Sequence, residues 1–250
     1  MSLVVNPLAL GNAISTATGF IATHEGVPYL VTNWHVVTGR SPETNKPLLR
    51  SAAVPDALAV LHLVPGEDLS WEWKIESLYD DHATPLWLEH PHHGQGVDVV
   101  ALRLTETADV ELYPYDLANP GPNIVYGPSD LASIIGFPFG MTGGGALGIW
   151  VQGTIATEPE IDYDDLPQLL IDSRTRPGQS GSPVILHRTN GYFTEDGSMI
   201  NDGVPGTRFL GIYSGRMNKE SDLGRVWKAL ALTEILYAQE RGSRPRAIRS

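Results

Sequence analysis

Short apolar or alternating segments recur along the chain between turn-forming residues, and this pattern limits the choice of fold more than any other feature. The 26 glycines and 19 prolines are spread among these segments and are not gathered in one linker. Such spacing is typical of an all-β barrel or sandwich. The segments are GFIATH (19–24), YLVTNW (29–34), DALAVLHLV (56–64), SWEWKIE (70–76), VDVVALRL (97–104), ASIIGF (132–137), GIWVQGTIA (148–156), QLLIDS (168–173), SPVILH (182–187), RFLGIYS (208–214) and GRVWKAL (224–230).

Two segments show a clear period. SWEWKIE alternates along its length and places Trp71, Trp73 and Ile75 on one face of a strand. Helical spacing of apolar residues occurs only near the end of the chain, where it predicts a helix over about 229–240. The sequence therefore predicts many strands followed by one late helix.

The weakest division of the chain lies at about 112–130, where prolines and glycines cluster in YPYDLANPGPNIVYGPSD. Such a cluster is typical of a crossing between two β units. We therefore expect one domain over residues 1–240, with a first half at about 15–112 and a second half at about 125–228. A functional site would be expected in the cleft between the halves.

Composition excludes several classes of protein. The chain has no cysteine, which excludes a cysteine nucleophile, a cysteine-based zinc site and a disulfide scaffold. Its formal net charge of −12 argues against nucleic acid as a partner. The sequence has neither a signal peptide nor an apolar run of membrane-spanning length, so we expect no membrane partner and a cytoplasmic protein, with a secreted mature form as the alternative.

The last ten residues, 241–250, contain four arginines and no acid. We expect them to form a disordered basic tail, and docking onto an acidic surface is the alternative.

The segment GQSGSP (178–183) raises the question of a nucleophile. Alone, it is ordinary turn chemistry. A nucleophilic serine needs a base for its proton and backbone N–H groups for the negative charge that develops on the substrate oxygen. Gly178 would allow a tight conformation that aims its N–H and that of Ser180 at one point. Position 182 is serine, so the segment is not the G-x-S-x-G turn of α/β-hydrolases.

Two other residues could support such a serine. His35 directly follows the strand-like YLVTNW, so it could project from a strand end into a cleft, although on this evidence alone a structural role is favoured. Asp98 lies inside the β-branched run VDVVALRL, where a buried carboxylate would need a hydrogen-bonding partner such as an imidazole. A water-facing Asp98 at the mouth of the strand is the alternative.

Five blocks together resemble the trypsin-like serine peptidases, in particular the bacterial branch of the high-temperature-requirement proteases and the glutamyl endopeptidases. The blocks are LVTNWHVV, VDVVALRL, IIGFPFG, IDSRTRPGQSGSPV and FLGIYSG, in the family's order. The resemblance covers the chain from about Gly19 to the last helix. It implies two six-stranded antiparallel β-barrels, followed by a C-terminal helix.

The same resemblance implies roles for individual residues. Ser180 would be the nucleophile, His35 the general base, and Asp98 the residue that orients His35. The N–H groups of Gly178 and Ser180 would form the oxyanion hole. The substrate-binding residues would be Arg174, Thr175, Tyr213, Ser214 and Gly215, with the strand at 213–216 pairing with the substrate backbone.

The resemblance therefore implies a serine endopeptidase that acts on peptides or proteins through an acyl-enzyme. The alternative is a latent or inactive binding module of the same fold, which would need a protein partner to form its oxyanion hole. The residue preferred before the cleaved bond stays open between an acidic and an apolar side chain, whereas a basic one is disfavoured because no Asp lies at the expected pocket base.

Several residues depart from the family's pattern. Trp34, directly before His35, replaces a small residue and must pack behind the site. Gln179 replaces the Asp that pairs with a new N-terminal amine in members activated by cleavage, so we do not expect that route of activation. The histidines of HPHHG (90–94) fit no established zinc spacing, and we expect neither a metal nor a cofactor.

Overall fold

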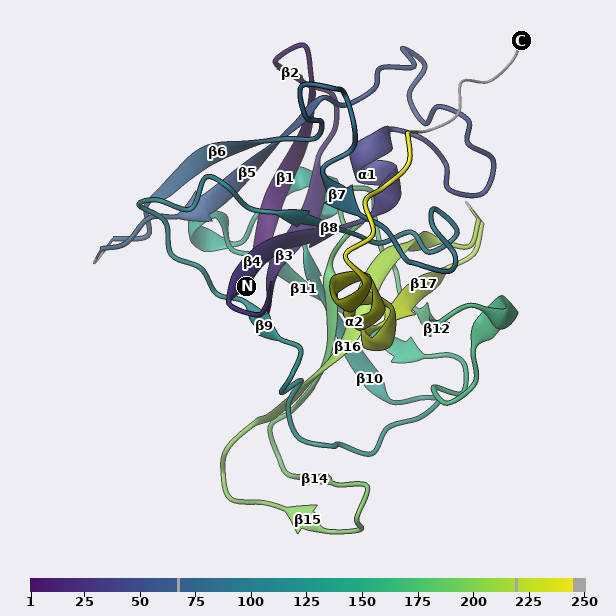
Figure 1. Ribbon diagram of the computed structural model, residues 1–250. Coiled ribbons are helices and arrows are strands. Elements are labelled where there is room, and N and C mark those ends of the chain that lie inside the picture. The colour runs from purple at the N-terminus through teal and green to yellow at the C-terminus, as the bar shows by residue number, and fades with distance from the viewer. Residues whose placement is uncertain (67, 219, 245–250) are drawn as a thin grey trace.

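The computed structural model describes residues 1–66, 68–218 and 220–244. Most of these residues belong to strands and the loops between them (Figure 1). In chain order the elements are β1 (Ser2–Ala9), β2 (Asn12–Ala13), β3 (Ala17–His24), β4 (Val27–Thr32), α1 (Trp34–Thr38), β5 (Ala57–Leu63), β6 (Trp71–Ser77), β7 (Trp87–Leu88), β8 (Val100–Arg103), β9 (Tyr115–Asp116), β10 (Leu131–Gly136), η1 (Pro138–Gly140), η2 (Gly144–Ala146), β11 (Ile149–Ile155), η3 (Tyr163–Asp165), β12 (Gln168–Asp172), β13 (Pro183–Arg188), β14 (Tyr192–Phe193), β15 (Met199–Ile200), β16 (Gly206–Arg216), β17 (Leu223–Lys228) and α2 (Ala229–Ala238).

The strands form two main sheets, one for each half of the chain. In the second half, β10-β11-β12-β17-β16-β13 close into a six-stranded barrel. In the first half, nine strands follow the order β6-β5-β1-β3-β4-β8-β7, with β2 paired to β1 and β9 paired to β3. The fold class expected from the sequence is confirmed. Of the two barrels expected, the barrel of the second half is the one that strand pairing closes among the described residues.

The limits of the elements differ in places from those expected. β1 (Ser2–Ala9) pairs with β3 and β5, so the first sheet begins before residue 15. The late helix is confirmed and spans Ala229–Ala238. No helix in the described part of the chain is long and apolar enough to cross a membrane.

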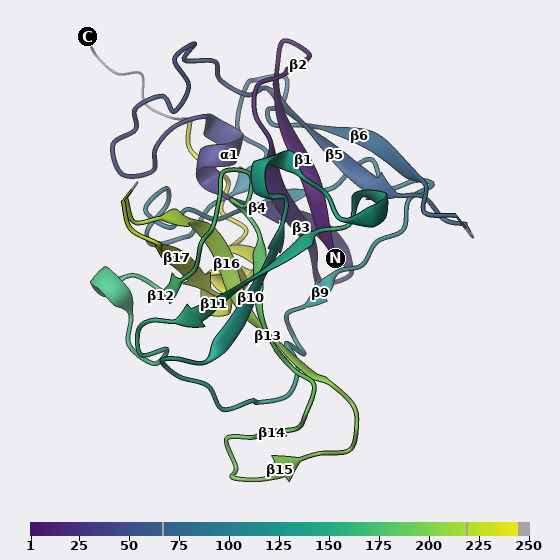
Figure 2. The same ribbon diagram turned by 180° about the vertical axis from the view of Figure 1, so that it is seen from behind.

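Each half has its own core, and a third core joins the halves. The joining core contains Phe20 and Val31 of the first sheet together with Phe209 and Trp227 of the barrel. Helix α2 packs Leu232, Ile235 and Leu236 into the same cluster. Figures 1 and 2 show the two sheets on either side of this junction, with α2 beside β16 and β17. The two halves are therefore joined by a packed interface.

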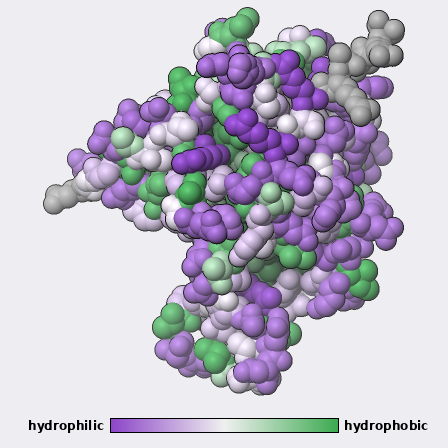
Figure 3. All heavy atoms as spheres, viewed as in Figure 1, coloured by the Kyte–Doolittle hydropathy of each residue, from purple (hydrophilic) through white to green (hydrophobic). Residues whose placement is uncertain are grey.

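A long hairpin extends away from the barrel and carries β14 and β15 at its far end (Figures 1 and 2). Phe193 and Met199 on this arm are largely exposed. Figure 3 shows hydrophobic side chains on this arm and at several other places on a mostly hydrophilic face.

Residues 241–244, the described part of the basic tail, contact the rest of the chain. Arg241 forms a bridge with Leu88, and the N–H of Gly242 donates to the carbonyl of Trp87 at 2.8 Å. Arg241 also pairs with Asp80 at 3.1 Å. Residues 241–244 thus contact the first half of the chain, and the expectation of disorder for residues 245–250 lies outside the described residues.

Candidate active site

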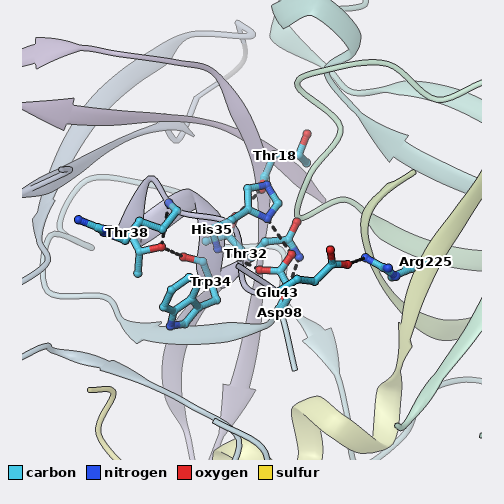
Figure 4. A network of polar contacts seen from close by, with 10 residues as sticks. Thr18, Thr32, Trp34, His35, Thr38, Glu43, Asp98 and Arg225 are labelled. Atoms are coloured by element: carbon cyan, nitrogen blue, oxygen red, sulfur yellow. Dashed lines mark hydrogen bonds and ion pairs between the residues drawn. The ribbon is translucent and has the colours of Figure 1, made fainter. Parts of the chain in front are cut away.

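His35 and Asp98 form a close pair at the junction of the two halves. Helix α1 starts directly after β4 and places His35 in its first turn. Nδ1 of His35 lies 2.7 Å from one carboxylate oxygen of Asp98, and the backbone N–H of His35 donates to the other at 2.9 Å. Asp98 is 3% exposed, and these two donors compensate for the burial of its charge. Figure 4 shows the pair from close by.

The residues before His35 hold this pair in place from behind. The side-chain amide of Asn33 donates to the carbonyl of Asp98 at 2.7 Å. The indole of Trp34 is buried in the core of the first half, and its N–H donates to Glu89 at 3.0 Å. Glu89 also accepts hydrogen bonds from the Trp87 indole and from the backbone of Ser243 in the docked tail. The large residue before His35 therefore anchors α1 and does not enter the site.

The loop that carries Ser180 is docked onto β3 of the first half. The N–H of Thr18, on β3, donates to the carbonyl of Ser180 at 2.9 Å. The hydroxyl of Thr18 donates to the carbonyl of Gly178 at 2.8 Å. Gly181, with φ +84°, packs so closely here that a Cβ would lie 2.1 Å from the carbonyl oxygen of Thr18. Only glycine fits, and this contact fixes the loop of Ser180 against β3, which pairs with β4, the strand before His35.

Among the described residues, no hydrogen bond joins Ser180 to His35. Such catalytic hydrogen bonds are often long without substrate and shorten when substrate binds. The two residues still share supports, since Thr32, three positions before His35, donates its hydroxyl to the same Thr18 carbonyl at 2.8 Å.

The backbone around Gly178 leaves two N–H groups unused. In the described part of the chain, neither the N–H of Gly178 nor that of Ser180 has a hydrogen-bond partner. The carbonyl of Pro177 accepts from the N–H of Phe139 at 2.6 Å. Because carbonyl and N–H point in opposite directions across one planar trans peptide, the N–H of Gly178 points away from Phe139. Two free donors next to a serine can stabilise an oxyanion.

Gln179 closes the turn beneath the serine. Its side chain is fully buried, and its carbonyl oxygen accepts from the N–H of Arg176 at 2.8 Å. The residue before Ser180 therefore holds its loop through neutral hydrogen bonds.

A pocket of about 460 Å³ opens beside Ser180. Three of its lining residues, Thr175, Tyr213 and Gly215, were expected from the sequence. Ser214 lines a second cavity of about 250 Å³, which it shares with Asp98. Arg174 is exposed and lies outside the residues that line either cavity.

Other pocket residues had no signal in the sequence, or only a weak one. Arg176 and Arg216 line the pocket beside Ser180, and Leu48 reaches it from the long loop after α1. Glu43, on the same loop, pairs with Arg225 of β17 at 2.5 Å and lies beside Asp98 in Figure 4. Arg216 could have been found, since it ends the strand expected to bind substrate, but nothing local identifies Leu48.

The histidine-rich segment has a structural contact of its own. His90 is 3% exposed, and its Nε2 lies 2.7 Å from a carboxylate oxygen of Glu234 on α2. Burial lowers the pKa of His90, whereas its contact with Glu234 acts in the opposite direction. Searched over the described residues, the chain has no cluster of side chains suited to hold a metal ion.

Comparisons with known proteins agree with this architecture. The sequence model of a family described as "Trypsin-like peptidase domain" matches residues 17–191, more than half of the chain. A search of curated proteins found no match.

Two solved structures are similar to the chain over most of its length. The serine endoprotease of Yersinia pestis is 17% identical with a TM-score of 0.51, over 95% of this chain and 61% of that one. The chain thus spans about three fifths of that protein. The active form of the Rv3671c protease of M. tuberculosis is 15% identical with a TM-score of 0.49, over 98% of this chain and 83% of that one. At such identities the likeness of the first structure establishes the fold alone.

Proposed function

Because the chain belongs to the family of trypsin-like peptidase domains, we propose that it is a serine endopeptidase with Ser180, His35 and Asp98 as its catalytic triad. One observation carries the proposal. The buried Asp98 holds His35 by ring and backbone at the junction where Thr18 docks the loop of Ser180. Three residue types suited to nucleophilic catalysis thus converge from three segments of the chain.

The proposed mechanism gives each of these groups one role. Ser180 attacks the scissile carbonyl carbon through its hydroxyl oxygen, and Nε2 of His35 takes the hydroxyl proton. Asp98 accepts the N–H at Nδ1, which fixes the tautomer that leaves Nε2 free as a base and stabilises the imidazolium that forms. His35 then gives the proton to the leaving amine, and the acyl group remains on Ser180.

In the second half of the reaction, water takes the place of Ser180 as the nucleophile, and Ser180 becomes the leaving group. His35 takes a proton from a water molecule, whose oxygen attacks the acyl carbon, and then gives that proton to the Ser180 oxygen as the acyl–oxygen bond breaks and the carboxylic acid product leaves. In both steps, negative charge develops on the former carbonyl oxygen. The free N–H groups of Gly178 and Ser180 would donate to that oxygen without reorganisation, which is why a preformed pair of donors accelerates the reaction.

The substrate backbone would lie along β16. Tyr213 already exchanges backbone hydrogen bonds with the nucleophile loop, since its carbonyl accepts from Gly181 and its N–H donates to Ser182, each at 2.9 Å. Ser214 and Gly215 follow at the edge of the cavities beside Asp98 and Ser180. An extended peptide added at this edge would present its scissile bond to Ser180.

The test is covalent labelling with a fluorophosphonate, read by intact mass. We expect one adduct on the wild-type protein, none on Ser180→Ala, and an unchanged adduct on Ser198→Ala, an exposed serine of the projecting arm. With an activated ester as substrate, Ser180→Ala and His35→Ala should each lower turnover by roughly 10⁶-fold, and the double variant should lose little more.

The outcome also decides against the alternative. A binding module that needs a partner would fold normally and form no adduct alone. Additive losses in the double variant would contradict a triad that works as one unit.

A further inference from the structure

β6 (Trp71–Ser77) forms one edge of the first sheet and lies at its outer margin in Figures 1 and 2. Among the described strands, it pairs with β5 alone. The N–H and C=O groups along such an edge can template a further strand, and natural edges are usually short or interrupted by proline or a bulge. β6 runs over seven residues without proline or glycine, and its register with β5 has no shift. It therefore offers an intact edge for strand addition.

The backbone groups that face outward can be identified from the pairing with β5. At one end of the hairpin, the N–H of Val64 donates to the carbonyl of Ser70 at 2.9 Å. Bonded and non-bonded residues alternate along an antiparallel ladder, so the even-numbered residues of β6 bond to β5. The N–H and C=O groups of Trp71, Trp73 and Ile75 therefore point away from β5, and in the described part of the chain they have no backbone hydrogen-bond partner.

The side chains of β6 alternate between apolar and charged groups. Trp73 is 45% and Ile75 is 57% exposed, which is a large apolar area for an edge strand. On the opposite face, Lys74 lies 3.0 Å from Glu72 of the same strand. Charges on an edge strand oppose the addition of most other strands. A suitable occupant must therefore cover the apolar face and also supply opposite charges to Glu72 and Lys74.

A second copy of β6 meets both requirements. In an antiparallel pair with a two-fold axis at Trp73, each residue faces the residue of the second copy that lies equally far beyond position 73. Trp73 then exchanges backbone hydrogen bonds with Trp73 of the second copy, and Trp71 faces Ile75 in the same way. Glu72 faces Lys74 of the second copy, in a non-hydrogen-bonded pair where side chains are closest. The two copies together align alternating charges on one face.

The neighbouring registers are unfavourable. The outward backbone groups stay matched if one copy slides by two residues in either direction. One slide places Lys74 opposite Lys74 of the second copy, and the other places Glu72 opposite Glu72. Like charges directly opposite each other are destabilising. The charges of β6 thus favour the pairing centred on Trp73 over its neighbours.

We propose that the chain forms a two-fold symmetric dimer in which β6 pairs antiparallel with β6 of a second copy, centred on Trp73. The pairing joins the first sheets of the two copies into one continuous sheet. The strand β3, onto which the Ser180 loop docks, is separated from β6 by β5 and β1. The dimer therefore does not use the proposed catalytic residues, and its test needs no assay of activity.

The experiment is sedimentation velocity at about 1–100 μM, the range in which small interfaces associate. We expect the wild-type protein to change from monomer to dimer as its concentration rises. Lys74→Glu and Glu72→Lys should each weaken the dimer by about tenfold or more, because each turns two attractive cross-strand pairs into repulsive ones. Both variants should stay folded in thermal unfolding, since an ion pair with an exposed partner contributes little to stability.

An equimolar mixture of the two variants is the decisive measurement. In a mixed dimer each introduced charge faces an opposite charge of the other variant, so the mixture should dimerise about as well as wild type. The ion pair within each strand stays broken in the mixture, so a recovery requires pairing between copies. Glu158→Lys is the control partner for Lys74→Glu: it makes the same change of net charge as Glu72→Lys at an exposed residue of the second half, and should leave Lys74→Glu monomeric.

The apolar face is tested by a second pair of variants. Trp73→Thr should abolish the dimer, because it removes the two indoles at the centre of the interface while threonine keeps the preference for a strand. Trp150→Thr is the control, since it removes an exposed tryptophan from β11 of the barrel, and it should dimerise as wild type does.

A wild-type protein that is still monomeric at about 100 μM would overturn the proposal. A dimer that Lys74→Glu leaves unchanged would also overturn it, because the copies would then meet at another surface. The same holds for a mixture of Lys74→Glu and Glu72→Lys that associates no more than either variant alone.

Discussion

Replacement of Gly178 by alanine tests the oxyanion hole most directly, because the structure defines what the added methyl group would meet. Gly178 has φ +97°, which side chains rarely adopt, and a Cβ built there lies 2.3 Å from the carbonyl oxygen of Phe137. The N–H groups of Phe139 and Gly140 are also near, each with its nitrogen 3.2 Å from that Cβ. The chain must therefore rotate or shift at position 178, and the N–H at this position moves with it.

The expected loss follows from the number of donors affected. Loss of one oxyanion donor costs about 10²–10³-fold in kcat, equivalent to about 2.7–4 kcal/mol of transition-state stabilisation. Alanine at a positive φ costs about 1–2 kcal/mol of stability in addition. For a chain of this length, that lowers Tm by a few degrees, on the order of 2–4 °C per kcal/mol. We expect Gly178→Ala to remain folded and to lose activity far out of proportion to stability.

Gly197→Ala is the matched control. Gly197 has φ +84° and no heavy atom within 4 Å of a built Cβ, and it lies in the turn of the projecting arm. It therefore carries the conformational cost without the collision and far from Ser180. The assays are kcat with an activated ester and thermal unfolding, measured on both variants.

The reasoning fails if Gly178→Ala keeps kcat within about threefold of wild type. It also fails if Gly197→Ala loses as much activity as Gly178→Ala, because conformational strain alone would then explain both.

Two further predictions concern other polar groups. Asp98→Asn should lower kcat by about 10⁴-fold while the protein stays folded, because an amide nitrogen facing His35 imposes the wrong tautomer; an ester assay with less than a tenfold loss would contradict this role. His62 is fully buried, and neither ring nitrogen has a hydrogen-bond partner among the described residues; burial, with a smaller effect of Lys74, lowers its pKa to about 4 from the ordinary 6.5. The unfolded chain therefore binds a proton that the folded chain refuses, so stability is full above pH 6.5 and falls by about 3 kcal/mol as pH drops to about 4. Urea unfolding across this range should show that loss in wild type and a smaller one in His62→Leu, and parallel curves would refute it.

Much of the architecture could be predicted from local sequence. Most of the apolar segments became strands, since strand pairing needs only a short alternating or apolar run between turns. The late helix ends within two residues of its expected limit. The approach of His35 to Asp98 was expected only from the resemblance of LVTNWHVV and VDVVALRL to trypsin-like peptidases, because the residues alone left a structural His35 and a water-facing Asp98 open.

The buried face of an edge strand could not be predicted in the same way. Alternation correctly places Trp73 and Ile75 on one face of β6, but both are largely exposed. The opposite face is the buried one at Glu76, whose carboxylate accepts hydrogen bonds from the backbone of Thr105 and Glu106 and from the hydroxyl of Thr105. Periodicity gives the two faces of a strand, whereas the partner that covers each face is a matter of tertiary structure.

The lining of the pocket could not be predicted from local sequence either, because it depends on tertiary structure. Leu48 enters it from a loop between α1 and β5 that has no periodic pattern, and the Glu43–Arg225 pair joins this loop to the second half. The local sequence does not show which of Arg174 and Arg176 would line the pocket, because both lie in the same segment, SRTRPG. Their different positions depend on the turn that Gln179 closes by accepting from the N–H of Arg176.

One residue without any sequence signal unites the parts of the site. Thr18 donates its N–H to the Ser180 carbonyl and its hydroxyl to the Gly178 carbonyl, and its own carbonyl accepts from Thr32. A single position on β3 thus locates the proposed nucleophile, the proposed oxyanion donors and the strand that leads to His35. Misplacement of reacting groups by about 1 Å can cost on the order of 10²-fold in rate. The catalytic geometry therefore depends on how the two halves dock at β3, and this docking explains why two β units and a packed junction are needed to build one small site.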